Sequence, residues 1–367
     1  MRAPAKTISR RRFLRAAMAA AGTAALPSVA GGCSGPGPDH STARSGAPCA
    51  AFTTRGVVLV PGDLTFRGWP ELASRAGLTT IGLHHGTSPR AVAQFIQSQE
   101  GTTFLASCSR LGLEVEYELH AMGELLPREL FVRDPTLFRM DDRGERNPDA
   151  NLCVHSRHAL EIASANAVEL ARILRPSMGR YFFWGDDGKP WCRCPACRPF
   201  TDSDQALLLE NRLIAALRRE DPRAQLAHLA YANTREPPRQ VRPEPGVFLE
   251  FAPIEMRHQR ELSRLEDAAN RPFLDALEAN LEVFPRDSAQ ALEYWLDVSM
   301  YSGWRKPARK LPFSEAAVDA DLDVYRRYGV GHVTSFAVFI DAEYIARFGE
   351  AVEVVKYGAL LGGRNKS

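Results

Sequence analysis

Two adjacent aspartates have the residue types and the position to do acid–base chemistry. Asp186 and Asp187 follow an apolar run, residues 181–184, and stand between Gly185 and Gly188. Carboxylates after a buried strand are typical of α/β barrels, which present catalytic groups at the carboxyl ends of their strands. Neighbouring residues of a strand point to opposite faces, so both acids could serve one site only if the glycines let the backbone turn.

A group of cysteines comes directly after the aspartates. Cys192, Cys194 and Cys197 have a C-x-C-x-x-C spacing, and together with Cys153 they could form a four-thiolate zinc site, with His155 as another candidate ligand. One or two disulfides, such as Cys153 with one of the three, are the alternative. In both cases we expect a structural role and no cofactor for catalysis, because a four-thiolate site has no open coordination position.

The first 33 residues have the features of a signal for export. The run SRRRFLR, residues 9–15, fits the twin-arginine pattern S-R-R-x-F-L-K with one Lys-to-Arg change, and a weakly apolar, Ala-rich run follows. Cys33 ends a segment that resembles a degenerate lipobox. We therefore expect a periplasmic or cell-surface protein, with and without lipid on Cys33 as alternatives. Residues 34–50 are rich in Gly, Pro and Ser, which predicts a flexible tether.

The charge balance argues against nucleic acid as a partner. The leader holds six of the 46 Lys and Arg residues and none of the 44 Asp and Glu residues. The rest of the chain therefore has 40 basic and 44 acidic residues, a formal charge of −4. Binding of phosphates requires a basic surface, which this composition does not favour.

Apolar segments alternate with helix-period segments through residues 51–363, which we interpret as a single domain. Helical periodicity is clear at 159–174 and 205–220. Eight strands with helical crossovers predict a (β/α)8 barrel of the α/β class. An open doubly wound sheet is the alternative, but no G-x-G-x-x-G follows any of the strands. The predicted strands are 55–60, 79–84, 113–119, 180–184, 225–231, 247–252, 290–296 and 332–338.

Acids, histidines and aromatic residues gather at the ends of these predicted strands. A lone acid after a strand is usually a helix N-cap or an ion-pair partner, but convergence at one rim favours a binding site. Carboxylates beside Trp and Tyr suit a sugar, whose C–H faces stack on rings while its hydroxyls bind carboxylates. The candidate substrate-binding residues are Glu118, His120, Tyr231, Glu250, Glu293 and Tyr294.

Several runs of the chain resemble a bacterial family of glycosidase-like barrels long catalogued as a domain of unknown function. The resemblance covers about residues 55–355 and rests most specifically on the D-G and C-x-C-x-x-C block. Some members of that family are endo-β-N-acetylglucosaminidases acting on N-glycans, so the resemblance implies a barrel, a carbohydrate substrate and carboxylate chemistry. The runs are HAMGELLPRELF, RMDDRGERNPDANLCVHS, WGDDGKPWCRCPAC, SDQALLLENRLIAALRREDP and LAYANTREPP.

The aspartate doublet also resembles the acid pair of barrels that cleave N-acetylhexosaminides by substrate assistance. There the acetamide oxygen of the sugar attacks the anomeric carbon, one carboxylate polarises the acetamide and the other protonates the leaving oxygen. The resemblance implies Asp187 as general acid/base and Asp186 as polariser. A retaining mechanism with Asp187 or Glu118 as acid and Glu293 as nucleophile is an alternative, and so is a purely structural role in which the doublet caps the cysteine loop.

These observations predict an exported glycoside hydrolase that acts on a β-linked N-acetylhexosamine-containing glycan. A non-catalytic carbohydrate-binding surface protein on the same scaffold is the first alternative. A glycosidase that cleaves uronic acids is the second, and it would need a basic clamp for the sugar carboxylate. Arg128, Arg139 or Arg305 could supply that clamp.

Overall fold

The structure is a computed structural model that describes residues 52–86, 88–256 and 266–363. The predicted leader, Cys33 and the tether lie outside the described residues. The described residues belong to one compact unit, which contains all the strands described below. Within the described ranges, no helix combines the length and the apolar character needed to cross a bilayer.

Eight parallel strands form a closed barrel in the order β1 to β8, which confirms the predicted (β/α)8 fold. The barrel closes where β1 pairs with β8, with Thr54 opposite His332 and Val58 opposite Phe336. Each strand falls within its predicted segment or one residue outside it. The strands are β1 Thr54–Leu59, β2 Thr80–Leu83, β3 Glu114–His120, β4 Arg180–Trp184, β5 Gln225–Ala230, β6 Val247–Phe251, β7 Gln290–Glu293 and β8 His332–Phe336.

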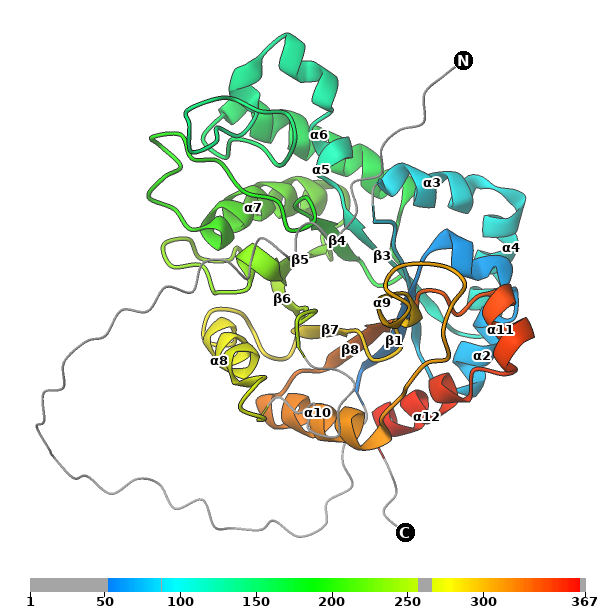
Figure 1. The fold of residues 1–367 in the computed structure, drawn as a ribbon. Coiled ribbons are helices and arrows are strands. Elements are labelled where there is room, and N and C mark those ends of the chain that lie inside the picture. The colour runs from blue at the N-terminus through cyan, green and yellow to red at the C-terminus, as the bar shows by residue number, and fades with distance from the viewer. Residues whose placement is uncertain (1–51, 87, 257–265, 364–367) are drawn as a thin grey trace, which may run out of the picture. The chain divides into compact units, whose positions relative to one another are not determined.

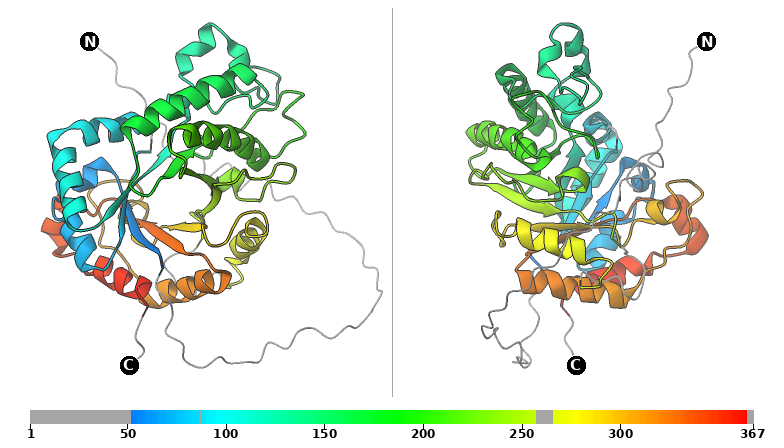
Figure 2. Two further views of the ribbon diagram at one scale, coloured as in Figure 1. Left: turned by 180° about the vertical axis from the view of Figure 1, so that it is seen from behind. Right: turned by 60° about the vertical axis from the view of Figure 1, so that its left-hand side comes forward.

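Helices lie around the outside of the barrel, as the three views in Figures 1 and 2 show. The α-helices are α2 Trp69–Arg75, α3 Pro89–Gln97, α4 Gln99–Arg110, α5 Met122–Leu125, α6 Arg157–Ile173, α7 Asp202–Glu220, α8 Arg271–Asn280, α9 Val298–Tyr301, α10 Glu315–Tyr328, α11 Ala342–Phe348 and α12 Val352–Leu361. The 3₁₀ helices are η2 Pro61–Thr65, η3 Arg128–Val132, η4 Pro135–Leu137 and η5 Ala232–Thr234.

Side-chain alternation along the strands divides the apolar core into two parts. Every second strand residue points toward the barrel axis, and the residues between point toward the helices. A large cluster fills the space between strands and helices, and a smaller one fills the barrel interior. The buried interior residues are Val58, Phe182, Trp184, Ala227, Leu229, Phe248, Ala252, Leu292, Tyr294 and Phe336.

Side-chain caps fix the starts of two helices near the predicted site. Helix α6 follows Cys153, and α7 follows the loop with the two aspartates and the other three cysteines. The Ser156 hydroxyl accepts a hydrogen bond from the amide of Ala159 at the start of α6. Thr201 and Asp204 form a capping box at the start of α7. Asp204 also accepts bonds from the amides of residues 239–241, in the segment between β5 and β6. The loops before α6 and α7 are therefore anchored at the ends where these helices begin.

Candidate functional site

Six ring-bearing side chains, each from the last residue of a strand or the residue directly after it, form one layer at the carboxyl end of the barrel. We call this set the aromatic layer. Adjacent rings lie within contact range: the centroids of His84 and Phe336 are 5.1 Å apart, those of Tyr294 and Phe336 5.3 Å, and those of His120 and Trp184 5.1 Å. Four of the rings are buried, and those of His120 and Tyr231 stay partly exposed, so these two offer ring faces on which a pyranose can stack. The layer consists of His84, His120, Trp184, Tyr231, Tyr294 and Phe336.

Asp187 lies next to the aromatic layer, three residues after β4 ends. Its Oδ1 accepts a hydrogen bond of 3.0 Å from the hydroxyl of Tyr231 and lies 3.8 Å from Nε2 of His120. Nδ1 of His120 is 2.6 Å from the carbonyl oxygen of Gly185, which can only accept, so that nitrogen carries the hydrogen. The Asp187 side chain keeps 29% of its surface exposed. A substrate oxygen could therefore reach this carboxyl group.

Asp186 is held by the loop that precedes α6. Its Oδ2 accepts hydrogen bonds from the Arg128 guanidinium at 2.5 Å and from the Asn151 amide at 2.6 Å. In return, the Asp186 amide donates to Oδ1 of Asn151 at 2.9 Å. Asp186 therefore joins two loops, and both of these donors bind the same carboxylate oxygen.

Asn151 is a residue of this site that the sequence did not reveal. Its side chain is fully buried, and Nδ2 donates to the carbonyl oxygens of Lys189 and Pro190 at 3.2 and 3.1 Å. Its backbone has a φ of +39°, a conformation that asparagine tolerates better than most residues. The only sequence signal was its place two residues before Cys153. We call the set of bonds from Asn151 to Asp186, Lys189 and Pro190 the Asn151 clamp.

Glu118 and Glu250, predicted as substrate-binding residues, lie deeper in the barrel than the aromatic layer. Both are fully buried, and Oε2 of Glu250 accepts a hydrogen bond of 2.7 Å from Nε1 of Trp184. Burial, and then the neighbouring charge of Glu250, raises the pKa of Glu118 well above its ordinary value. Burial also raises the pKa of Glu250 to about 8. The structure does not bring these two carboxyl groups to the exposed rim.

Glu293 points away from the barrel axis. Leu292 and Tyr294 belong to the interior cluster, so the side chain between them faces the helices. The hydroxyl of Tyr325, on α10, donates a hydrogen bond to Oε1 of Glu293, and Glu293 is fully buried. Among the predicted substrate-binding residues, His120, Tyr231 and Tyr294 come together near Asp187, whereas Glu293 is directed to the outer shell.

Other acids after the strands have the ordinary roles expected of caps and ion-pair partners. Asp297 accepts a bond from the amide of Met300 at the start of α9, and Asp341 accepts one from Tyr344 at the start of α11. Asp341 also pairs with Lys306. These contacts account for both carboxylates without a substrate.

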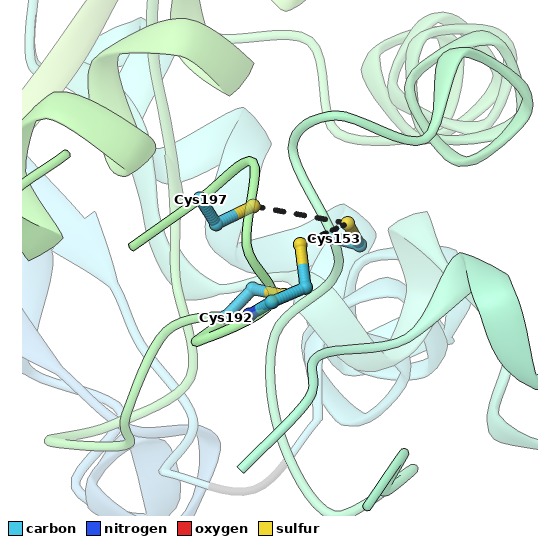
Figure 3. Close-up of side chains that lie close together, drawn as sticks. Cys153, Cys192 and Cys197 are labelled. Atoms are coloured by element: carbon cyan, nitrogen blue, oxygen red, sulfur yellow. Dashed lines mark hydrogen bonds between the residues drawn. The ribbon is translucent and has the colours of Figure 1, made fainter. Parts of the chain in front are cut away.

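The four cysteines Cys153, Cys192, Cys194 and Cys197, which we call the cysteine cluster, come together as predicted. All four are buried free thiols, and their sulfur atoms lie within 4.8 Å of one another. Figure 3 shows Cys153 on one segment facing Cys192 and Cys197 on another. Four thiols at this spacing could hold a metal ion.

A separate groove of about 1010 Å³ lies between α6 and α7 on the outside of the barrel. Its lining includes Val154, Leu160, Val168, Leu208 and Ala216. None of the aromatic-layer residues and neither aspartate of the doublet lines it, so it is distinct from the site at Asp187.

Comparison with known sequences identifies the family. Residues 74–300 match the family described as Domain of unknown function (DUF4838). The chain belongs to this family. The match spans β3, β4 and the cysteine cluster, and confirms the resemblance to a family of unknown function. No curated protein matches the sequence significantly.

Solved structures show that the fold is shared with glycoside hydrolases. A β-N-acetylhexosaminidase from Bacteroides fragilis superimposes with a TM-score of 0.52 at 13% identity, over 84% of this chain and 65% of that one. A catalytic mutant of a GH42 β-galactosidase from G. stearothermophilus gives a TM-score of 0.51 at 12% identity, over 86% of this chain and 57% of that one. The chain thus spans less than two thirds of either protein. At these identities the likeness is one of fold.

Proposed function

We propose that the protein is a glycoside hydrolase with Asp187 as its general acid/base, acting on a β-linked N-acetylhexosamine-containing glycan. The observation that carries the proposal is the setting of Asp187. It is a partly exposed carboxyl group at the end of β4, bonded to Tyr231 and adjacent to a layer of aromatic rings. A sugar stacked on the partly exposed ring of Tyr231 would bring its glycosidic oxygen toward a group able to protonate it.

The orientation of Glu293 favours substrate assistance over a protein nucleophile. A retaining enzyme with a carboxylate nucleophile needs that carboxylate about 5–5.5 Å from the acid. Glu293 instead faces Tyr325 in the outer shell, on the opposite face of the strand from Tyr294 and the aromatic layer. With an acetamide as the internal nucleophile, the reaction needs only an acid and a polarising group, and no cofactor. Asp186 is the neighbouring carboxylate, and its Oδ1 is the oxygen left for an acetamide after Arg128 and Asn151 bind Oδ2.

The uronic-acid alternative receives less support from the arginines. Arg128 pairs with Asp186, and the buried Arg139 makes a two-point ion pair with Asp149. Both guanidinium groups are therefore engaged within the protein. Arg305, the third candidate, is exposed.

The test compares wild-type protein with Asp187→Asn on aryl β-N-acetylhexosaminides, aryl β-glucosides, aryl uronides and N-glycoproteins. We expect cleavage of N-acetylated substrates only, with a loss of 10²- to 10⁴-fold, the order of magnitude general acid catalysis supplies, when Asp187 is replaced. A 2,4-dinitrophenyl substrate needs no protonation, so the variant should keep most of its activity on that substrate. If the protein bound the same glycans without cleaving any of them, the result would contradict the hydrolase and support the carbohydrate-binding alternative.

We also propose export by the twin-arginine route, with lipid attached at Cys33. Replacing Arg10 and Arg11 with lysine should leave the protein in the cytoplasm, whereas the matched change Arg15→Lys should not. Mass spectrometry of the exported chain, compared with Cys33→Ser, tests the lipid. An unchanged cellular distribution of the double variant would exclude this route.

A further inference from the structure

We propose that the cysteine cluster binds one zinc ion through four thiolates, and that this ion locks the loop that presents Asp186 and Asp187. The cluster joins two segments far apart in sequence. Cys153 lies just before α6, and the other three ligands lie in the loop between β4 and α7. The metal site stands on its own geometry, and only its effect on catalysis depends on the proposed function.

The sulfur positions fit a tetrahedral zinc ion. Sγ of Cys153 lies 3.8 Å from Sγ of Cys194 and 3.8 Å from Sγ of Cys197. Four ligands at the usual Zn–S distance of about 2.3 Å occupy a tetrahedron with edges of about 3.8 Å. A disulfide would need about 2.05 Å instead. The thiols are therefore spaced for a shared ion, and the dashed line between Cys153 and Cys197 in Figure 3 follows one of these edges.

The surroundings of the cluster supply the donors that metal-bound thiolates require. Two backbone amides approach Sγ of Cys192, those of Met140 at 3.3 Å and Cys194 at 3.5 Å. The Arg146 guanidinium lies 3.8 Å from the same sulfur. Four thiolates around Zn²⁺ have a net charge of −2, which a nearby cation and oriented N–H groups stabilise.

His155 is placed beside the cluster, outside the set of four ligands. Its Nδ1 lies 3.2 Å from Sγ of Cys197, a distance suited to an N–H···S hydrogen bond. Four sulfur atoms already complete a tetrahedral site. We therefore assign His155 the role of a hydrogen-bond donor to a bound thiolate, which orients that ligand.

The ion would be structural, because four buried protein ligands leave no position for water or substrate. Its consequence for the site at Asp187 follows from chain connectivity. Cys153 is two residues from Asn151, and Cys192 is two residues from Pro190, which Asn151 binds. The Asn151 clamp and the metal therefore fasten the same two segments at consecutive points. Loss of the ion would remove the anchor next to the clamp and leave the doublet loop held by hydrogen bonds and the Arg128–Asp186 ion pair.

The experiment measures metal in the purified full-length protein by elemental analysis, without any substrate. We expect one zinc per chain in the wild type and a loss of at least tenfold in Cys197→Ser. The matched control is Cys108→Ser, which replaces a buried free cysteine on α4 outside the cluster and should keep the full metal content. X-ray absorption of the wild-type zinc protein should give four sulfur neighbours at about 2.3 Å.

The wild-type measurements decide the proposal even if Cys197→Ser does not fold. Cobalt-substituted wild-type protein should show the intense thiolate-to-cobalt absorption of a tetrahedral sulfur site. Removing the metal with a chelator should increase hydrogen exchange at the amides of Asn151 and Asp186. Wild-type protein with no bound metal, or with disulfides among the four cysteines, would overturn the proposal. Since none of these measurements uses a substrate, inactive protein that contains zinc would contradict only the proposed hydrolase function.

Discussion

The hydroxyl of Tyr231 donates a 3.0 Å hydrogen bond to Oδ1 of Asp187, between residues that follow the neighbouring strands β4 and β5. His120 faces the same oxygen from the end of β3 at 3.8 Å. Three adjacent strand ends thus converge on one carboxylate oxygen. Such convergence is how a barrel fixes the orientation of an acid before substrate binds.

Replacing Tyr231 with phenylalanine should lower kcat about tenfold, the equivalent of about 1.4 kcal/mol for one hydrogen bond to a charged group. The ionised carboxylate also loses a donor, so the alkaline limb of the pH profile of kcat should move to higher pH. Initial rates on an aryl β-N-acetylhexosaminide between pH 4 and 9 measure both effects. Tyr328→Phe, on the outer helix α10, is the matched control. Identical pH profiles of kcat for the two variants would show that Tyr231 has no role in orienting Asp187.

Loss of the Asn151 clamp should affect both stability and catalysis. Asn151→Gly removes the side-chain bonds to Asp186, Lys189 and Pro190, and we expect a decrease in the free energy of unfolding of about 2 kcal/mol or more. Asn151→Ala should lower the free energy of unfolding by about 1 kcal/mol more than Asn151→Gly does, because alanine does not readily adopt a positive φ. We expect kcat to fall about tenfold in both, since the doublet loop loses one of its anchors.

Urea unfolding and kcat, measured on the same preparations, check these two expectations. Asn211→Ala is the matched control, because Asn211 also joins two segments, by bonds to residues 242 and 244, but from the outer helix α7. It should lower stability and leave kcat unchanged. Equal kcat values for the Asn151 and Asn211 variants would show that the clamp has no part in positioning the acids.

The strands and the rim were predictable from sequence because each depends on local pattern. Buried strands are short apolar runs with turns on both sides, and residues after parallel strands meet at one end of a barrel wherever the chain places them. Asp187 and Tyr231 could therefore be assigned to one rim although they are 44 residues apart. The cysteine cluster was also predictable from local pattern. Cys192, Cys194 and Cys197 are close together in sequence, and only Cys153 comes from another part of the chain.

The direction in which the Glu293 side chain points could not be predicted, and neither could the role of Asn151. The two failures have different reasons. Glu293 ends β7 in the run QALEYWL, where one position decides between barrel interior and outer shell. The apolar pattern of that run does not reveal which residues point toward the barrel axis, since both faces of the strand are buried. Asn151 binds partners 35 to 39 residues away, and a single asparagine in a loop has no local pattern that indicates them.

The buried acids of the barrel interior should make stability depend on pH. Burial raises the pKa of Glu250 to about 8 and that of Glu116 to about 7, both above the ordinary value of 4.5. The folded state therefore binds protons that the unfolded state releases above pH 4.5. This contribution to stability is complete below about pH 4.5 and is lost as the pH rises through 7 to 8.

Glu250→Gln should weaken this dependence. The amide oxygen can still accept the bond from Trp184, but the residue no longer titrates. We expect the loss of unfolding free energy between pH 5 and pH 8 to be smaller in the variant than in the wild type by more than about 1 kcal/mol. Urea titrations at the two pH values measure it, with the exposed Glu282→Gln as control. A variant whose pH dependence equals that of the wild type would mean that Glu250 is ionised in the folded protein.

Glu293→Gln separates the two mechanisms that the sequence left open. Because Glu293 faces Tyr325 in the outer shell, we expect kcat/KM on an aryl β-N-acetylhexosaminide to change by less than about threefold, whereas Asp187→Asn should lose 10²- to 10⁴-fold. Glutamine keeps an oxygen to accept the Tyr325 bond, so the fold should tolerate the change. A loss of 100-fold or more in Glu293→Gln, with azide restoring turnover and forming a glycosyl azide, would instead identify Glu293 as a nucleophile. That result would require the end of β7 to turn inward when substrate binds.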